Sequence, residues 1–249
     1  MKYNELGLEE NRRLKGPYGK QLLRTMHRST AVLQWRNLYS DEPPSHGSMF
    51  FVNTGSALLA ITARHVYEAY VASAANDPKV TCQINNIRFD PGERLICSGV
   101  DCDVATFALR PAELTELERI TIPWPPVIPK VGQTVLIAGF PGFARTCPAP
   151  QHVDFFNYLA ITPVDSVSDR DISWAKPPSE ELVDILEKGL PPDGLDLAGM
   201  SGGPVAILQE NAGIVSWAIS GIIYESHQTL EITKAVRADV VKPDGTVGC

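Results

Sequence analysis

The sequence has no apolar run long enough to form a membrane-spanning helix. Residues 1–20 are polar and of mixed charge, without the apolar segment of a secretory signal peptide. Basic residues are also few: 22 lysines and arginines stand against 29 acidic residues, and they form no long cluster that could follow a phosphate backbone. We therefore expect a cytoplasmic protein with neither a membrane nor a nucleic acid as partner.

Cysteine is scarce, and no CxxC pair is present. The five cysteines are an odd number with irregular spacing, at positions 82, 97, 102, 147 and 249. This pattern favours reduced thiols over a framework of disulfides. A zinc site made from Cys82, Cys97 and Cys102 is the alternative, but the prediction is no metal and no cofactor.

What the sequence does contain is a series of short strand-like runs. They are rich in β-branched and aromatic residues and are bounded by Gly, Pro, Asn and Asp, which predicts antiparallel strands. In the first half the runs are TAVLQWRNL, SMFFVN, SALLAIT, VTCQI, RLICSG and VATFAL; in the second they are TVLIAGF, FFNYLAIT, PVAILQ, AGIVSWAIS, GIIYE and TLEIT. With 44% hydrophobic residues in 249, the chain can form one large domain or two small barrels.

A proline-rich stretch separates the two groups of strands. Proline lacks the N–H group that a sheet ladder requires, so the stretch is predicted to be a linker. Its prolines are Pro111, Pro123, Pro125, Pro126 and Pro129. The expected organisation is a first subdomain over 29–115, a linker over 116–130 and a second subdomain over 131–249.

Helices are expected to be few. Residues 1–28 carry the heaviest local charge, with a predicted helix around Lys20–His27, and are expected to form an arm outside the main core. The segment SEELVDILEKG, residues 179–189, is the other candidate helix.

The segment GMSGGP, residues 199–204, places Ser201 among small residues between two apolar runs. A serine becomes a nucleophile at neutral pH when a histidine, itself held by a carboxylate, acts as its base. Among five histidines, His65 has the most informative surroundings, because SALLAITARHVYEAY is typical of a strand that leads into a helix. Asp101 and Asp103, just before the run VATFAL, are both candidates for the carboxylate.

TARHV around His65, DVATFAL at Asp103 and GMSGGP around Ser201 resemble, in this order, the signature segments of trypsin-like (chymotrypsin-fold) serine peptidases. VGQTVLIAGFPG, residues 131–142, is similar to the strand that opens the second barrel in bacterial, HtrA-like members. The resemblance covers about residues 30–240. It implies an all-β fold of two six-stranded antiparallel β-barrels, the chymotrypsin-like double barrel, with a few short helices.

The resemblance also implies a serine endopeptidase. Ser201 would be the nucleophile, His65 the base and Asp103, rather than Asp101, the orienting acid. The backbone N–H groups of Gly199 and Ser201 would form the oxyanion hole.

Positions that line the primary substrate pocket in relatives correspond here to Leu195, Tyr224, Glu225 and Ser226. Leu195 favours an apolar substrate side chain, whereas Glu225 favours a basic one. The preference of the pocket therefore stays open.

Met200 departs from the pattern of secreted relatives. These carry an acidic residue before the serine, which pairs with a new amino terminus after cleavage, whereas this chain has Met200 there and no IVGG-like sequence after a basic residue. Activation by that route is not expected, and the resemblance is to the bacterial or intracellular branch. What orders the oxyanion loop is not evident from the sequence.

Other interpretations of GMSGGP fit less well. The GxSxG elbow of α/β-hydrolases requires an acid and then a histidine after the serine, but His227, the only later histidine, precedes Asp239 and Asp244. The spacings of phosphate-binding loops are absent. The remaining alternative is a catalytically silent or partner-activated protease-like module that binds proteins. Expected partners are a protein or peptide substrate and an activating protein.

Overall fold

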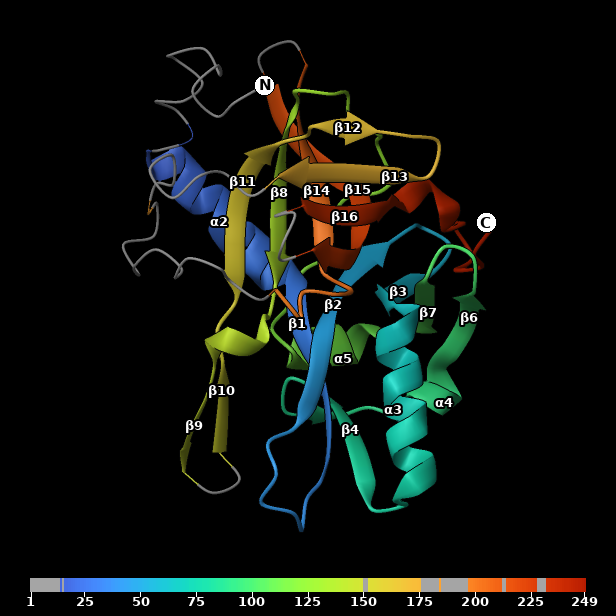
Figure 1. Cartoon of the computed structure of the whole chain (residues 1–249). Coiled ribbons are helices and arrows are strands. Elements are labelled where there is room, and N and C mark those ends of the chain that lie inside the picture. Colours follow the sequence, from blue (N-terminus) through green and yellow to red (C-terminus); the bar gives the residue numbers. More distant parts are fainter. Residues whose placement is uncertain are drawn as a thin grey trace.

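The structure, a computed structural model, describes residues 14, 16–149, 152–175, 184, 197–211, 214–227 and 232–249 (Figure 1). The predicted all-β architecture is confirmed, because two antiparallel sheets dominate the chain and helices are few. Each sheet has seven strands, one of which is only two residues long. The candidate helix 179–189 and Leu195 lie outside the described residues, apart from Asp184.

The N-terminal half forms the first sheet, in the order β5-β4-β1-β2-β3-β7-β6. Its strands are β1 (Thr30–Asn37), β2 (Ser45–Asn53), β3 (Leu58–Ala63), β4 (Val80–Ile84), β5 (Ile87–Arg88), β6 (Leu95–Gly99) and β7 (Val104–Ala108). Its helices are α2 (Pro17–Ser29), α3 (Arg64–Asn76), α4 (Pro91–Arg94) and α5 (Pro111–Glu116). All six runs predicted in this half are strands.

The C-terminal half forms the second sheet, in the order β11-β8-β14-β15-β16-β13-β12. Its strands are β8 (Thr134–Gly139), β11 (Tyr158–Pro163), β12 (Ser166–Val167), β13 (Asp171–Ala175), β14 (Pro204–Asn211), β15 (Ile214–His227) and β16 (Ile232–Arg237). A separate hairpin pairs β9 (Arg145–Ala149) with β10 (His152–Phe155), and short 3-10 turns occupy Gly142–Ala144 and Ala238–Val240. The hairpin, β12 and β13 were not predicted from the sequence.

Side chains alternate between two cores along the central strands, because successive residues of a strand point to opposite faces. In β2, Met49 and Phe51 lie in the core of the first sheet, whereas Phe50 and Val52 lie in a second core that both sheets share. In β8, Leu136 belongs to the shared core and Val135 to the core of the second sheet. The two sheets are therefore packed against each other through a continuous apolar layer.

Helix α2 confirms the predicted helix but corrects its expected place. Leu23 and Met26 are buried, as is Leu14 before the helix, and all three belong to the core shared by the sheets. The helix contacts β8 and β11 of the second sheet as well as β1 (Figure 1). The expectation that residues 1–28 form an arm outside the main core is therefore wrong for the part that the structure describes, because the apolar face of the helix is covered.

The proline-rich stretch connects the sheets and also packs between them. Ile122 is fully buried, and its N–H group donates to the Phe51 carbonyl of the first sheet. The Val127 N–H group donates to the Ile219 carbonyl of the second sheet at 2.9 Å. The connection thus helps to fix the position of one sheet on the other.

The cysteines also differ from the expectation. Cys102 and Cys249 form a disulfide, so the prediction of reduced thiols is wrong for this pair. Residues 243–249 fold back on the first sheet, where Thr54 Oγ1 donates to the Pro243 carbonyl at 2.6 Å. The pairing depends on this return of the chain, which the spacing of cysteines in the sequence does not reveal.

The three free cysteines should differ sharply in reactivity. Burial raises the pKa of the Cys82 thiol to about 12, whereas Cys147 is exposed. Since the thiolate is the reactive form, at pH 8 a fraction on the order of 10⁻⁴ of Cys82 would be ionised. In the native protein, a maleimide reagent should label Cys147 rapidly and leave Cys82 unmodified, as read by peptide mass spectrometry.

Thiol counting gives the control for this experiment. The unfolded protein should titrate three thiols without reductant and five after reduction. Rapid labelling of native Cys82, or five thiols without reductant, would contradict the described burial and pairing.

Candidate functional site

His65 lies where β3 ends and α3 begins, at the corner that the sequence predicts. Strand β3 pairs with β7, with Ala63 opposite Val104. Asp103 directly precedes Val104, so the two paired strands place Asp103 beside His65. The backbone of Asp103 is left-handed, with φ 53°, a conformation that Asp adopts more readily than most residues.

Both carboxylate oxygens of Asp103 bind His65. Nδ1 of the imidazole is 2.6 Å from Oδ2, and the backbone N–H group of His65 donates to Oδ1 at 2.9 Å. A carboxylate accepts from Nδ1–H and so fixes the ring with Nε2 available as an acceptor. The His65 side chain is 47% exposed and that of Asp103 23%, so the pair lies at the protein surface.

Asp101, the rival carboxylate, is exposed and makes no hydrogen bond or ion pair with another described residue. The left-handed turn at Asp103 directs the later of the two carboxylates toward the imidazole.

Ser201 lies in the turn just before β14, in the second half of the chain. Its carbonyl oxygen accepts from the N–H group of Ser48 in β2 at 2.8 Å. The next residue, Gly202, packs so closely on β3 that a Cβ atom there would overlap the Ser48 carbonyl oxygen and the Thr62 hydroxyl. The turn is therefore seated on the end of the strand that carries the chain into His65.

Ser48 holds the turn with its side chain as well. Its hydroxyl donates to the Gly199 carbonyl at 2.7 Å and accepts from the Phe140 N–H group at 2.9 Å. Its own carbonyl accepts from the Thr62 hydroxyl at 2.6 Å. Ser48 is fully buried, and every hydrogen-bonding group of this residue is satisfied by a partner.

The backbone of the turn at Gly199 is constrained by close neighbours. Gly199 has φ +97°, and a Cβ atom there would lie 2.6 Å from the Phe140 oxygen and 2.7 Å from His46 Nε2, so only glycine fits. Neither the Gly199 nor the Ser201 N–H group donates to another described residue. Two amide donors are thus left for an oxygen atom of a ligand.

Met200 and His46 complete the support of this turn. Met200 is 1% exposed and belongs to the core of the second sheet. The Nε2–H group of His46 donates to the Phe140 carbonyl at 2.9 Å. Burial lowers the pKa of His46; the hydrogen bond to Phe140 opposes this effect, and the charge of Arg145 adds to it. The imidazole is therefore neutral at neutral pH. The turn is ordered by burial of an apolar side chain and by these hydrogen bonds.

The structure brings His65 and Asp103 together, and it places the Ser201 turn against β3. Among the described residues, no hydrogen bond joins Ser201 Oγ to His65 Nε2. The imidazole and the serine thus approach from different sheets without a direct bond between them.

Three candidate pocket residues lie on β15 next to a register shift in its pairing with β16. Glu225 Oε2 is 2.9 Å from Lys234 Nζ. Ser226 Oγ is 3.3 Å from the Thr233 hydroxyl. The pKa of Tyr224 is raised to about 12, mainly by burial and also by the nearby Asp171 carboxylate, so its phenol stays protonated.

Within the described ranges, no group of three or more His, Cys, Asp or Glu side chains is placed to hold a metal ion. Cys102, part of the zinc alternative, is bonded to Cys249 instead. In the same ranges no helix is long and apolar enough to cross a membrane.

Comparison with known proteins gives structural matches only. No protein-family model matches the chain, and no curated protein matches its sequence. The serine protease domain of the Sesbania mosaic virus polyprotein is 11% identical over 83% of this chain and 87% of its own, with a TM-score of 0.45. The active form of the Rv3671c protease from M. tuberculosis is 15% identical over 88% of this chain and 82% of its own, with a TM-score of 0.44.

A third solved structure is an inactivated protease paralogue of the scabies mite, SMIPP-S-I1. It is 14% identical over 86% of this chain and 90% of its own, with a TM-score of 0.47. The similar structures thus come from a virus, a bacterium and an animal.

Ser48, His46 and Phe140 are the supporting residues that the sequence analysis missed. Phe140 lies 59 positions before Gly199 in the chain, Ser48 151 and His46 153. No local pattern marks them, since a serine or histidine beside an apolar strand is common. Only the packing of the two sheets brings them to the turn.

Substitution of Gly202 should disturb the turn strongly. Gly202→Ala adds a Cβ atom against backbone at φ +86°, whereas Gly55→Ala adds one at the same φ with nothing within 4 Å. The left-handed backbone alone costs about 1–2 kcal/mol, so Gly55→Ala should lose about that much and Gly202→Ala at least twice as much. Urea unfolding measures both, and equal losses would show that the described close approach is absent.

Proposed function

We propose that this chain is a serine endopeptidase that cleaves peptide bonds through a His65–Asp103–Ser201 triad and an acyl-enzyme intermediate. The observation that supports the proposal most is the doubly bonded contact of Asp103 with His65, beside a serine turn that has two free amide donors. This is the set of groups that acyl transfer needs: a base with a fixed tautomer, a nucleophile and donors for an oxyanion.

In the first half of the reaction, Ser201 Oγ attacks the scissile carbonyl carbon while His65 Nε2 takes the hydroxyl proton. Asp103 keeps the ring oriented and stabilises the imidazolium that forms. When the tetrahedral intermediate collapses, the C–N bond breaks and His65 returns the proton to the leaving amine. A water molecule, deprotonated by His65, then hydrolyses the Ser201 ester.

The N–H groups of Gly199 and Ser201 serve as the oxyanion hole. A donor in this position contributes roughly 3–4 kcal/mol to transition-state stabilisation. The Ser48 hydroxyl supports this role indirectly, because it holds the Gly199 carbonyl away from the place that the oxyanion would occupy.

No cleaved amino terminus is required in this proposal. Met200 is buried and Ser48 holds the turn, so the ordering that an acidic residue provides in secreted relatives has a substitute in this chain. The relation to the bacterial, HtrA-like branch stays a prediction from the sequence.

Among the candidate pocket residues Tyr224, Glu225 and Ser226, it is Glu225 whose contacts bear on the preferred substrate side chain. Because Lys234 neutralises Glu225, this carboxylate is a poor partner for a basic substrate side chain. An apolar preference is therefore the better proposal.

A second candidate is a latent, partner-activated form of the same module, which includes the catalytically silent case. The missing hydrogen bond between Ser201 and His65 favours it. Hydrogen bonds of this kind are often long or absent without substrate, so the endopeptidase remains the first proposal.

A fluorophosphonate probe tests the nucleophile. The wild-type protein should be labelled at one residue, Ser201→Ala should give no labelling, and His65→Ala should slow labelling by about 10³-fold or more because the base is lost. In-gel fluorescence measures the rate. Labelling that persists in Ser201→Ala would refute the nucleophile, and a silent wild-type protein that is labelled only after a protein partner is added would favour the latent form.

Asp101 supplies the matched control for the acid. Asp103→Asn should lower the labelling rate by several orders of magnitude, because the tautomer of His65 would no longer be fixed. Asp101→Asn, two residues away and exposed, should leave the rate within about twofold.

Ser48 tests the support of the oxyanion turn. Ser48→Ala and Ser220→Ala each remove a fully buried hydroxyl that donates to a carbonyl at 2.7 Å. Both should lose about 1–3 kcal/mol of unfolding free energy. Only Ser48→Ala should also slow fluorophosphonate labelling, by about tenfold, and an equal effect of Ser220→Ala on labelling would contradict the assigned role of Ser48.

A further inference from the structure

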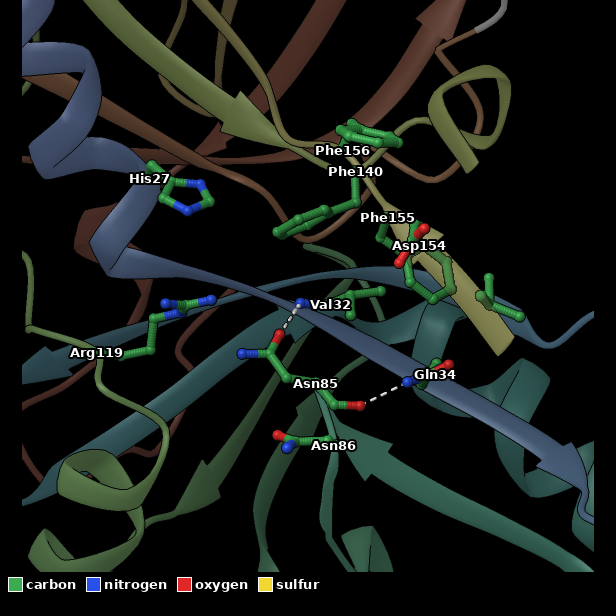
Figure 2. Close-up of a pocket in the computed structure, with 11 residues that line it drawn as sticks. His27, Val32, Gln34, Asn85, Asn86, Arg119, Phe140, Asp154, Phe155 and Phe156 are labelled. Carbon is green, nitrogen blue, oxygen red and sulfur yellow. Dashed lines mark hydrogen bonds between the residues drawn. The ribbon is translucent and has the colours of Figure 1, made fainter. Parts of the chain in front are cut away.

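A pocket of about 640 Å³ lies where the end of α2, β1, the β4–β5 turn and β10 meet (Figure 2). Its volume is in the range of small-molecule sites. His65, Asp103 and Ser201 do not line it. The question is which ligand its side chains would accept.

Arg119 provides a half-buried cation in the pocket wall. Its Nε atom is buried, and neither Nε nor the rest of the guanidinium has a hydrogen-bond or ion-pair partner among the described residues. Burial lowers the pKa of Arg119; Glu118 opposes this and Arg28 adds to it. A buried donor without an acceptor is costly, so an anion bound here would restore what the fold leaves unsatisfied.

Asn85 adds a second donor to the pocket. Its Oδ1 accepts from the Val32 N–H group at 3.1 Å, and this bond fixes the orientation of the amide because a backbone N–H group cannot accept. The Nδ2 group is then directed toward the Arg119 side of the pocket, as Figure 2 shows. It has no acceptor among the described residues.

His27 lies on the same side as Arg119 (Figure 2). Burial and, next, the charge of Arg119 lower the pKa of His27. The charge of Arg119 therefore acts on His27 across this side of the pocket. One side of the pocket therefore has donors and the positive charge of Arg119, and no carboxylate lines that side.

Away from Arg119, the pocket is lined by the aromatic side chains of Phe140, Phe155 and Phe156 and by the carboxylate of Asp154. In the view of Figure 2, the Phe140 ring lies between the Arg119 side and Asp154 on β10, Phe155 is next to Asp154, and Phe156 lies above Phe140. Aromatic rings pack well on a flat apolar group. Asp154 repels a second negative charge at that end, which selects against dianions.

We propose that this pocket binds a small monoanionic aromatic acid, with its carboxylate between Arg119 and Asn85 and its ring against Phe140. The site concerns binding only and does not rest on the proposed peptidase activity.

The probe for the test is 2-naphthoate, with 2-naphthamide as its uncharged counterpart. Naphthoate should bind the full chain with a Kd of about 1 mM or tighter, as measured by saturation-transfer NMR and calorimetry. Naphthamide should bind at least about tenfold more weakly, since it lacks the charge. Inorganic phosphate, which has no ring, should displace naphthoate only at a large excess.

Variants assign the binding to this pocket. Arg119→Gln removes the cation, and Asn85→Asp keeps the acceptor for Val32 and tolerates the φ of 53° while placing a negative charge in the site. Each should weaken naphthoate binding by about tenfold or more. Lys130→Gln, which removes one exposed positive charge elsewhere, should leave the Kd unchanged.

Circular dichroism melting of each variant checks that it folds. The proposal is overturned by any of three results: no naphthoate binding at 10-fold above the expected Kd of about 1 mM, equal binding of naphthamide, or equal Kd values for Arg119→Gln and Lys130→Gln in folded protein. Displacement of naphthoate by equimolar phosphate would overturn the proposed contact between the ligand ring and Phe140.

Discussion

The hydrogen bonds of Ser48 fix how the two halves of the molecule meet. The apolar core between the sheets supplies most of the attraction, but apolar contacts have little directionality and allow neighbouring arrangements. The Ser48 N–H group and hydroxyl bind the carbonyls of Ser201 and Gly199, and the same hydroxyl accepts from Phe140. Because all these groups are buried, a shift of one sheet on the other would leave several of them unsatisfied. The position of the serine turn beside His65 depends on this constraint.

The parts of the fold that follow from local pattern could be predicted from the sequence. Runs such as VATFAL and TVLIAGF are rich in apolar and β-branched residues and lie between turn residues, and both are strands. The corner at His65 was also predicted, since the change from strand to helix is visible in the residues around it. The proximity of Asp103 came from a resemblance, and the observed contact agrees with it.

Other features could not be predicted, because they depend on segments that are distant in the chain. Cys102 and Cys249 are 147 residues apart, and neither carries a local sign of pairing. The charged residues of the first 28 positions hide an apolar face that Leu23 and Met26 bury. The pocket beside Arg119 gathers side chains from a helix, two strands and a turn. Composition gives the kinds of residue available, but the packing of the sheets decides which of them meet.

The two ends of the described chain are exchanged between the sheets. Helix α2 precedes the first sheet but contacts β8 and β11 of the second, while residues 243–249 follow the second sheet but return to the first. Near Gly245, this returning segment covers Leu59 and Ile96. During synthesis on the ribosome, that surface of the first sheet stays exposed until the last strands of the second have been made. Each half therefore contributes a segment that covers apolar surface of the other, so neither half alone contains all the residues that cover its own sheet.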